Sequence, residues 1–228
     1  MNKEDYWVNY WTTNKIVKNI NHHGKVGRTI SGEPISEKNW SKTIKFLSDK
    51  MTLTSGDTVL DLGAGSGAIS VPFSKKAKMV YAVDISADLL KSIPSSPKIK
   101  KIKGDIREME FQDDSFSKIV FYFAIQHFSE TEVVHLFNKL FNCLQKGGVL
   151  YIGDIPDINK LFVFFNTAER KEAYFRSLAE HKPIIGTWFT KEFLVELAKK
   201  QKFKTVKVVI QPKYCINSHY RFDLILKK

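Results

Sequence analysis

Three acidic residues in the middle of this 228-residue chain follow short runs that read as strands. Asp61 and Asp84 each close an apolar run, and Asp105 follows residues 98–104, in which isoleucines alternate with lysines. A glycine-rich turn, residues 63–67, comes directly after the first run. Carboxylates accept hydrogen bonds from hydroxyl and amino groups, and open α/β sheets bind ligands outside the carboxyl ends of their strands. The pattern therefore predicts a nucleoside-binding crevice.

The residues around the turn indicate which nucleoside fits. Gly63-x-Gly65-x-x-Ala68 satisfies the dinucleotide fingerprint, so this motif alone leaves a dinucleotide-binding protein open. Asp61 stands just before the first glycine, where a carboxylate would repel a pyrophosphate but would pair with an ammonium group. Asp105 can accept a hydrogen bond from the exocyclic amine of adenine. Together they favour a nucleoside that carries an ammonium group.

This arrangement resembles the class I S-adenosylmethionine (SAM)-dependent methyltransferases, whose first motif, Asp-Leu-Gly-x-Gly-x-Gly, is matched by residues 61–67. The resemblance covers about residues 52–228. It implies a Rossmann-like α/β fold with a seven-stranded sheet in the order 3-2-1-4-5-7-6, helices on both faces, SAM as cofactor and S-adenosylhomocysteine as product. The cofactor-binding residues it implies are Asp61 for the methionine amino group, Gly63 and Gly65 beside the cofactor, Asp84 for the ribose hydroxyls, Asp105 for adenine N6 and the Ile106 N–H for adenine N1. A Rossmann dehydrogenase and a degenerate, non-catalytic fold remain the alternatives.

The hydrophobic pattern predicts the elements that hold these residues. Strands are expected over residues 58–62, 79–84, 98–104, 117–123, 149–154, 205–210 and 220–226. Helices are expected from about Ser36, over 67–76 and 87–93, from Ser129 to about 144, over 164–179 and from Thr190 to about 201. The continuous apolar fourth strand suits the centre of the sheet, and the lysine-rich third suits an edge. The last two strands follow each other without a helix and should pair antiparallel.

Two residues at strand ends are candidates for catalysis. His127 follows the fourth strand, and its imidazole can accept a proton near neutral pH. Asp154 ends the fifth strand, where a carboxylate could orient the acceptor or assist His127. A structural role stays open for each, because His127 could hydrogen-bond the backbone at a helix start and Asp154 could cap the next turn.

Two segments lie outside the regular alternation of strands and helices. Residues 1–50 are expected to form an N-terminal helical cap, and residues 51–228 the methyltransferase core with an inserted lid at about 155–185. Both segments are expected to roof the acceptor pocket. His22 and His23 lie in a loop and are more typical of exposed histidines than of catalysts. The cap and lid also contain residues that could contact the acceptor or only make ion pairs and pack: Arg28, Arg170, Arg176 and Trp188.

Motifs of nucleobase methyltransferases are missing from the sequence. The end of the fourth strand has no Asn/Asp-Pro-Pro-Tyr motif, and neither cysteine follows a proline. Residues 26–32, 152–157 and 186–189 instead resemble segments of bacterial methyltransferases associated with surface-glycan pathways. This favours methyl transfer to a hydroxyl of a small polar acceptor, a sugar or a phosphorylated sugar intermediate. N-methylation of a small amine, RNA methylation and SAM binding without catalysis remain alternatives.

Composition sets limits on partners. The net charge of +12 comes mostly from lysine and would attract anionic or nucleotide-linked acceptors, an anionic membrane face or RNA. With only five arginines, the chain is less typical of nucleic-acid readers. No apolar segment approaches the roughly 20 residues of a membrane span, and the N-terminus has no apolar signal core, so a cytoplasmic protein is expected. The histidine and cysteine spacings predict no metal site.

Overall fold

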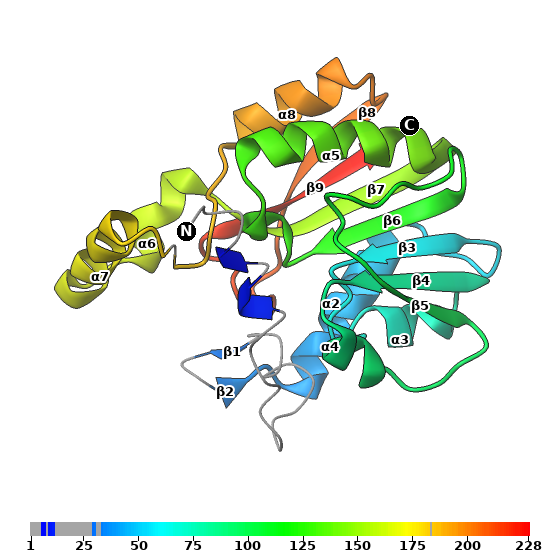
Figure 1. Cartoon of the computed structure of the whole chain (residues 1–228), viewed down its shortest axis with the longest axis horizontal. Helices are drawn as coiled ribbons and strands as arrows, with labels where there is room; N and C mark the ends of the chain where they lie inside the picture. The colour runs from blue at the N-terminus through cyan, green and yellow to red at the C-terminus, as the bar shows by residue number, and fades with distance from the viewer. Residues whose placement is uncertain (1–5, 8, 12–28, 31–32, 183) are drawn as a thin grey trace.

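Seven strands form one mixed sheet at the centre of the molecule (Figure 1). The computed structural model describes residues 6–7, 9–11, 29–30, 33–182 and 184–228. The strands are β3 (Thr58–Leu62), β4 (Met79–Asp84), β5 (Ile99–Lys103), β6 (Phe116–Tyr122), β7 (Leu144–Pro156), β8 (Thr205–Ile210) and β9 (Arg221–Lys227). Their order is β5-β4-β3-β6-β7-β9-β8. Counted from β3, this is the predicted order 3-2-1-4-5-7-6, and the Rossmann-like methyltransferase fold is confirmed.

Strand direction decides where the predicted site residues meet. The five strands from β3 to β7 run parallel to one another, whereas β9 is antiparallel to both β7 and β8. The predicted antiparallel pair at the end of the chain is therefore confirmed. Because parallel strands share one carboxyl edge, the segments after β3, β4, β5 and β6 emerge on the same side of the sheet. A separate small sheet pairs β1 (Thr29–Ile30) with β2 (Glu33–Pro34).

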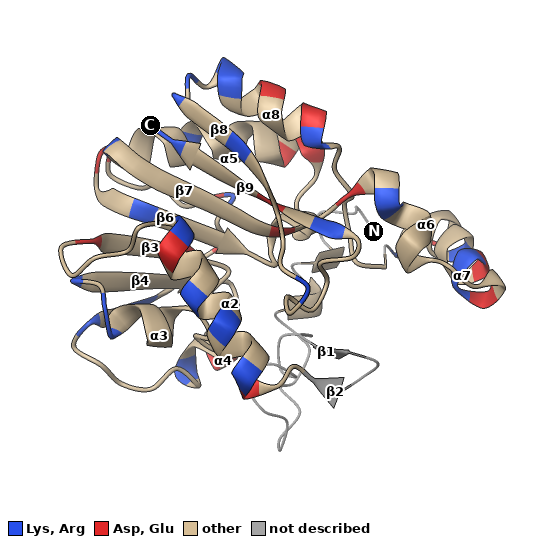
Figure 2. Ribbon diagram, turned by 180° about the vertical axis from the view of Figure 1, so that it is seen from behind, with Lys and Arg blue, Asp and Glu red and all other residues tan. Residues whose placement is uncertain are grey.

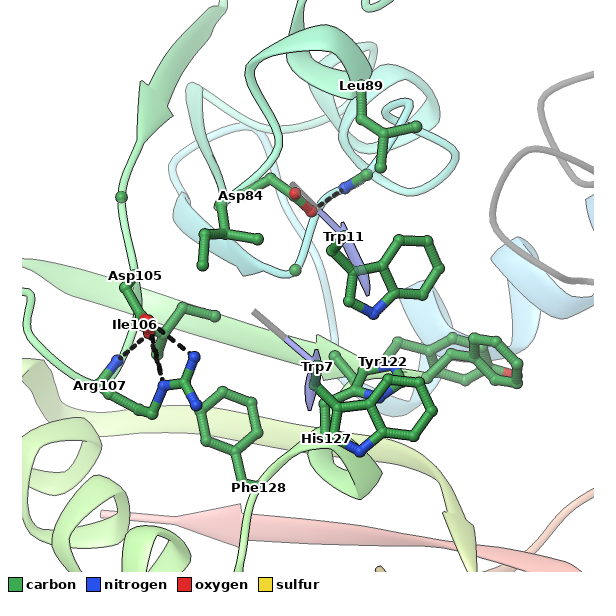
Figure 3. Close-up of a pocket in the computed structure, with 16 residues that line it drawn as sticks. Trp7, Trp11, Asp84, Leu89, Asp105, Ile106, Arg107, Tyr122, His127 and Phe128 are labelled. Carbon is green, nitrogen blue, oxygen red and sulfur yellow. Dashed lines mark hydrogen bonds and ion pairs between the residues drawn. The ribbon is translucent and has the colours of Figure 1, made fainter. Parts of the chain in front are cut away.

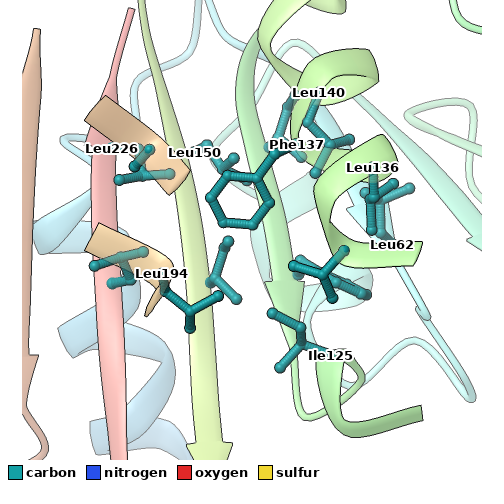
Figure 4. Close-up of a cluster of buried hydrophobic side chains, with 14 of the residues drawn as sticks. Leu62, Ile125, Leu136, Phe137, Leu140, Leu150, Leu194 and Leu226 are labelled. Atoms are coloured by element: carbon teal, nitrogen blue, oxygen red, sulfur yellow. The ribbon is translucent and has the colours of Figure 1, made fainter. Parts of the chain in front are cut away.

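Helices cover both faces of the sheet. On one face α5 (Glu130–Cys143) and α8 (Lys191–Lys200) pack on β3, β6 and β7, and the leucine-rich cluster of this face is drawn in Figure 4. On the other face α2 (Glu37–Lys50) and α3 (Ser70–Ser74) pack on the same strands. Successive residues of the central strand β6 divide between the two clusters, since side chains alternate across a strand. β5 lies at a sheet edge with its lysines exposed, as predicted.

The predicted helix starts carry the expected caps. Ser36 accepts a hydrogen bond from the backbone N–H of Asn39 before α2, and Thr190 accepts one from Phe193 before α8. Ser129 and Glu132 form the predicted capping box of α5. Among the described residues, no helix is both long and apolar enough to cross a membrane.

Some element bounds differ from those predicted. The first helix of the core shortens to α3, because residues 63–69 form a turn in which Gly67 has a φ of +81°. The predicted helix over 164–179 becomes α6 (Leu161–Phe164) and α7 (Ala168–Ala179), with Thr167 as the N-cap of α7. These two helices project beyond the sheet (Figure 1).

Gly153 in β7 is packed too tightly to carry a side chain. A Cβ at this position would lie 2.6 Å from Cε2 of Tyr122 on the neighbouring strand, and closer still to Cδ2. Gly153→Ala should therefore lower the free energy of unfolding by about 1–3 kcal/mol, the usual cost of overpacking. Gly56→Ala is the matched control, because its Cβ would meet no atom nearer than 3.9 Å. Urea denaturation of both variants gives the comparison, and equal midpoints would contradict the expectation.

Candidate active site

A pocket lies at the carboxyl ends of β3, β4, β5 and β6 (Figure 3). Its walls come from the glycine turn after β3, the end of β4, the segment after β5, residues 122–128 after β6, and two tryptophans near the N-terminus. Six of the eight site residues predicted from the sequence line it: Gly63, Gly65, Asp84, Asp105, Ile106 and His127.

The glycine turn is held against the end of β4. Gly63 and Gly65 have φ values of +69° and +54°, a region that favours glycine. A Cβ at Gly63 would lie 2.8 Å from Cβ of Ala124, so the turn approaches the end of β6 closely. The Gly65 N–H donates to Oδ2 of Asp84 over 2.7 Å, and the Ser86 N–H donates to Oδ1 over 2.8 Å. Burial raises the pKa of Asp84, and these backbone donors oppose the rise.

The acid after β5 is paired with a neighbouring guanidinium. Arg107 donates to both carboxylate oxygens of Asp105, from Nε over 2.9 Å and from Nη2 over 2.7 Å. Its Nη1 also donates to Glu132, the capping-box residue of α5, over 3.2 Å. The Asp105 side chain is 18% exposed, so part of it still faces the pocket beside Ile106. Its contact with an adenine amine stays a prediction.

Asp61 does not line the pocket. Its side chain is buried in β3, and Oδ2 accepts a hydrogen bond from the hydroxyl of Ser70 over 2.6 Å. Ser70 begins α3, so this bond ties the first helix of the core to the strand before the glycine turn. The predicted role of Asp61 toward an amino group stays a prediction.

His127 ends a 3₁₀ turn, Ile125–His127, directly after β6. The indole of Trp7 packs on its ring with centroids 4.3 Å apart, and Trp11 lies edge-on at 5.5 Å. Part of the imidazole stays exposed, but Nδ1 is buried without a hydrogen-bond partner. Burial, and then the positive charges of Arg221 and Arg107, lower the pKa of His127 to about 3. The imidazole is therefore neutral at physiological pH.

Asp154 lies in a buried polar cluster and not in the wall of the pocket. It is 1% exposed and has a φ of +59°. Its carboxylate accepts hydrogen bonds from Gln211 over 3.2 Å and Asn217 over 2.9 Å, and it lies 3.5 Å from Nη1 of Arg221. Arg221 also donates to the Asp154 carbonyl over 2.5 Å. These contacts favour the structural role over the orientation of an acceptor.

Comparison with known proteins finds a match for the central part of the chain. A family described as "Methyltransferase domain" matches residues 59–148. An uncharacterized methyltransferase of Anoxybacillus flavithermus is 28% identical over 127 residues, which cover 55% of this chain and 60% of that protein. O-methyltransferase 3 of Dictyostelium discoideum is 27% identical over 183 residues, 71% of this chain and 41% of that protein. The chain thus spans less than two thirds of the length of these curated relatives.

Solved structures agree on the fold. A SAM-dependent methyltransferase of Methanosarcina mazei superposes with a TM-score of 0.59 at 18% identity, covering 80% of this chain and 96% of that one. Magnesium protoporphyrin IX methyltransferase of Synechocystis, with bound S-adenosylhomocysteine, gives 0.62 at 14% identity and covers 98% and 93%. Residues 59–148 match a methyltransferase domain, and the fold is that of class I, SAM-dependent methyltransferases.

The pocket of this methyltransferase domain fits its cofactor. Gly63 and Gly65 line the pocket without side chains, which leaves their backbone accessible to a nucleoside cofactor. Asp84 and Ile106 both line the pocket, and their contacts with the ribose and the adenine stay predictions.

Two tryptophans that line the pocket were not among the predicted site residues, although they stand in an aromatic cluster of the predicted cap. Trp7 and Trp11 belong to the described helical residues near the N-terminus, and both line the pocket of the methyltransferase domain. In Figure 3 the Trp11 indole lies toward Asp84 and Leu89, whereas Trp7 lies beside His127. The feature of the sequence that could have indicated them is their spacing of four residues, because it places both indoles on one face of a helix.

The inserted segment of the methyltransferase core lies apart from this pocket. Trp188 packs in an aromatic cluster with Phe165 and Tyr220. Residues of α7 line a separate hollow beside the start of α5. Arg170 donates to the Phe164 carbonyl, and Arg176 pairs with Glu172 in α7. None of these arginines lines the cofactor pocket; His22, His23 and Arg28 lie outside the described residues.

The lowered pKa of His127 predicts an acid-sensitive fold. The unfolded chain binds a proton at this residue near pH 6.5, whereas the folded protein resists it until about pH 3. The free energy of unfolding should therefore fall as pH drops below 6.5, by about 1–2 kcal/mol between pH 7 and pH 5 from this residue. His127→Gln should lose less stability over that interval than the wild type, measured by urea denaturation. His135→Gln, at an exposed position, is the control, and parallel curves for wild type and His127→Gln would contradict the assignment.

Proposed function

We propose that this protein transfers the methyl group of SAM to a hydroxyl of a small-molecule acceptor. The observation that supports this proposal is that one pocket brings together the glycine turn, Asp84, Ile106 and His127. Asp84 and the glycine turn offer groups for a nucleoside, and the His127 imidazole lies against the rings of Trp7 and Trp11. Bound SAM supplies an activated methyl group on a sulfonium.

In this proposal the residues of the chain act mainly by aligning the acceptor with the methyl group of SAM. Asp84 would hold the ribose of bound SAM, and the backbone of the glycine turn would contact the cofactor. Trp7 and Trp11 exclude water from the pocket. Methyl transfer is an in-line displacement, so fixing the acceptor oxygen behind the methyl carbon lowers much of the barrier. His127 accepts a hydrogen bond from the acceptor hydroxyl and takes its proton during transfer.

The relatives support a small acceptor. One is named an O-methyltransferase, and another, from Paenarthrobacter aurescens, is named for demethylmenaquinone and is 30% identical over 111 residues, 48% of this chain and 43% of that protein. Lysines and arginines are spread over several elements, including α2 and α8, with acidic residues among them (Figure 2). A dispersed charge of this kind supports a small molecule over RNA.

A phosphorylated acceptor finds less support than a neutral one. Arg107 is the only lysine or arginine among the described residues that line the pocket, and both Asp105 and Glu132 already engage it. The proposed acceptor therefore presents an uncharged group to His127. The sugar acceptor expected from the sequence is included in the assay below. The surface-glycan pathway is not part of this proposal.

A turnover assay tests the proposal. Formation of S-adenosylhomocysteine from SAM is measured with a panel of sugars, sugar phosphates, phenols, amines and RNA. We expect turnover with at least one neutral hydroxyl compound. Turnover confined to amines or RNA would reject hydroxyl transfer, and calorimetric binding of SAM with no turnover on any class would favour a non-catalytic SAM-binding protein.

A further inference from the structure

The end of the pocket beside His127 is walled by aromatic rings. Trp7 and Trp11 pack on His127 from the N-terminal segment (Figure 3), and Phe123 and Phe128 line the same pocket from the chain after β6. Aromatic walls favour a flat apolar ligand, because ring faces and edges pack closely on one another. An acceptor that binds between such walls should therefore have a mostly apolar surface.

Few polar atoms are available in these walls. Three of them are buried and have no hydrogen-bond partner: Nε1 of Trp7, Nε1 of Trp11 and Nδ1 of His127. Buried polar groups are rarely left without a hydrogen-bond partner. Each unpaired group lowers the stability of the folded protein by roughly 1–3 kcal/mol. A ligand with one or two oxygens would pair them. A sugar carries a hydroxyl on most of its carbons and would leave several of its own groups unpaired here.

Trp7 itself shows what fits against His127. Its indole, 9% exposed, packs on the imidazole with a centroid separation of 4.3 Å and an interplanar angle of 53°. The chain thus places a flat bicyclic ring, with one polar N–H, beside His127. A ligand of similar shape could take this place if the tryptophan moved outward.

We propose that the acceptor is a hydroxylated aromatic compound, a phenol or a fused-ring analogue, that packs on His127 in the place held by the Trp7 indole. The proposal rests on the proposed hydroxyl transfer and names its substrate class. Trp7 is displaced on binding and covers the outer face of the acceptor ring.

The charges near His127 suit a phenol better than an amine. Arg221 and Arg107 both lower the pKa of the imidazole, so the local potential is positive. A positive potential stabilises a phenolate and disfavours an ammonium group. A phenol has a pKa of about 10, and its proton therefore leaves more easily than that of an aliphatic hydroxyl.

The bonds, electrons and proton of the transfer are all accounted for. The phenolic oxygen forms a bond to the methyl carbon, and the carbon–sulfur bond breaks with its electron pair left on sulfur. The phenolic proton passes to His127 and then to water when the pocket opens. The products are the aryl methyl ether, S-adenosylhomocysteine and a proton.

Fluorine NMR of the full chain labelled with 5-fluorotryptophan tests the displacement. The four tryptophans give four signals, and each is assigned by its loss in a Trp→Phe variant. With S-adenosylhomocysteine saturating, 2-naphthol should move the Trp7 signal toward that of a solvent-exposed fluorotryptophan. The Trp188 signal, from a buried tryptophan outside the pocket, should stay in place. Methyl glucoside at the same concentration should move neither signal.

Turnover separates this inference from the proposed function. We expect kcat/KM for 2-naphthol or catechol to exceed that for methyl glucoside at least tenfold. Turnover of the glucoside with inert phenols would overturn the aromatic acceptor but leave hydroxyl transfer standing. Turnover of amines or RNA alone would overturn both. Binding of 2-naphthol with an unmoved Trp7 signal would overturn the displacement of the indole.

Discussion

Asp84→Ala should weaken the binding of S-adenosylhomocysteine by about 10- to 100-fold. Hydrogen bonds to a charged group contribute about 1.5–3 kcal/mol, and each 1.4 kcal/mol corresponds to a factor of ten. The carboxylate lines the pocket and is also the acceptor for the Gly65 N–H. Its removal therefore loses the expected ribose contact and loosens the turn that approaches the cofactor. Isothermal calorimetry measures the change.

Two controls separate binding from folding. Asp88→Ala removes an acid from α4 (Ala87–Lys91), where Asp88 is exposed and pairs with Lys91, and it should leave affinity unchanged. Asp84→Asn keeps one oxygen acceptor and should lie between wild type and Asp84→Ala. Equal affinities for wild type and Asp84→Ala, with both proteins folded by circular dichroism, would remove Asp84 from the cofactor site.

The sheet could be predicted from the sequence because its signals are local. The apolar run of β6 needs burial on both faces, and the lysines of β5 need solvent, so their places at the centre and the edge follow from composition. The acid at the end of β4 and the glycine turn after β3 then meet because parallel strands share one carboxyl edge. The same reasoning placed His127 correctly in the pocket wall.

The fate of Asp154 could not be predicted in this way. The sequence places it at the end of β7, next to the strand that carries His127. Its partners Gln211, Asn217 and Arg221 come from the chain between β8 and β9 and from the start of β9. Only the antiparallel return of β9 brings them close, so a carboxylate expected in the pocket is instead satisfied behind it. The packing of Trp7 on His127 depends in the same way on tertiary structure, across 120 residues of chain.

His127→Ala should lower the methyl-transfer rate by about 100-fold or more if the imidazole takes the acceptor proton. The affinity for S-adenosylhomocysteine should change little, because His127 is not among the residues predicted to hold the cofactor. Single-turnover rates and calorimetry measure the two quantities. His135→Ala, on the exposed face of α5, is the matched control and should keep the wild-type rate. A rate per folded molecule equal to that of the wild type would leave His127 with a structural role.

The pH profile identifies the proton acceptor more sharply than the rate alone. With its pKa lowered to about 3, His127 stays neutral between pH 5 and pH 8, and the wild-type rate should show no histidine titration in that range. Trp7→Ala exposes the imidazole to water, which should raise its pKa toward the ordinary value of about 6.5. The rate of Trp7→Ala should therefore gain an acid limb that rises with pH and levels above about 6.5. The double variant Trp7→Ala/His127→Ala should lack this limb, and a limb that persists there would assign the titration to another group.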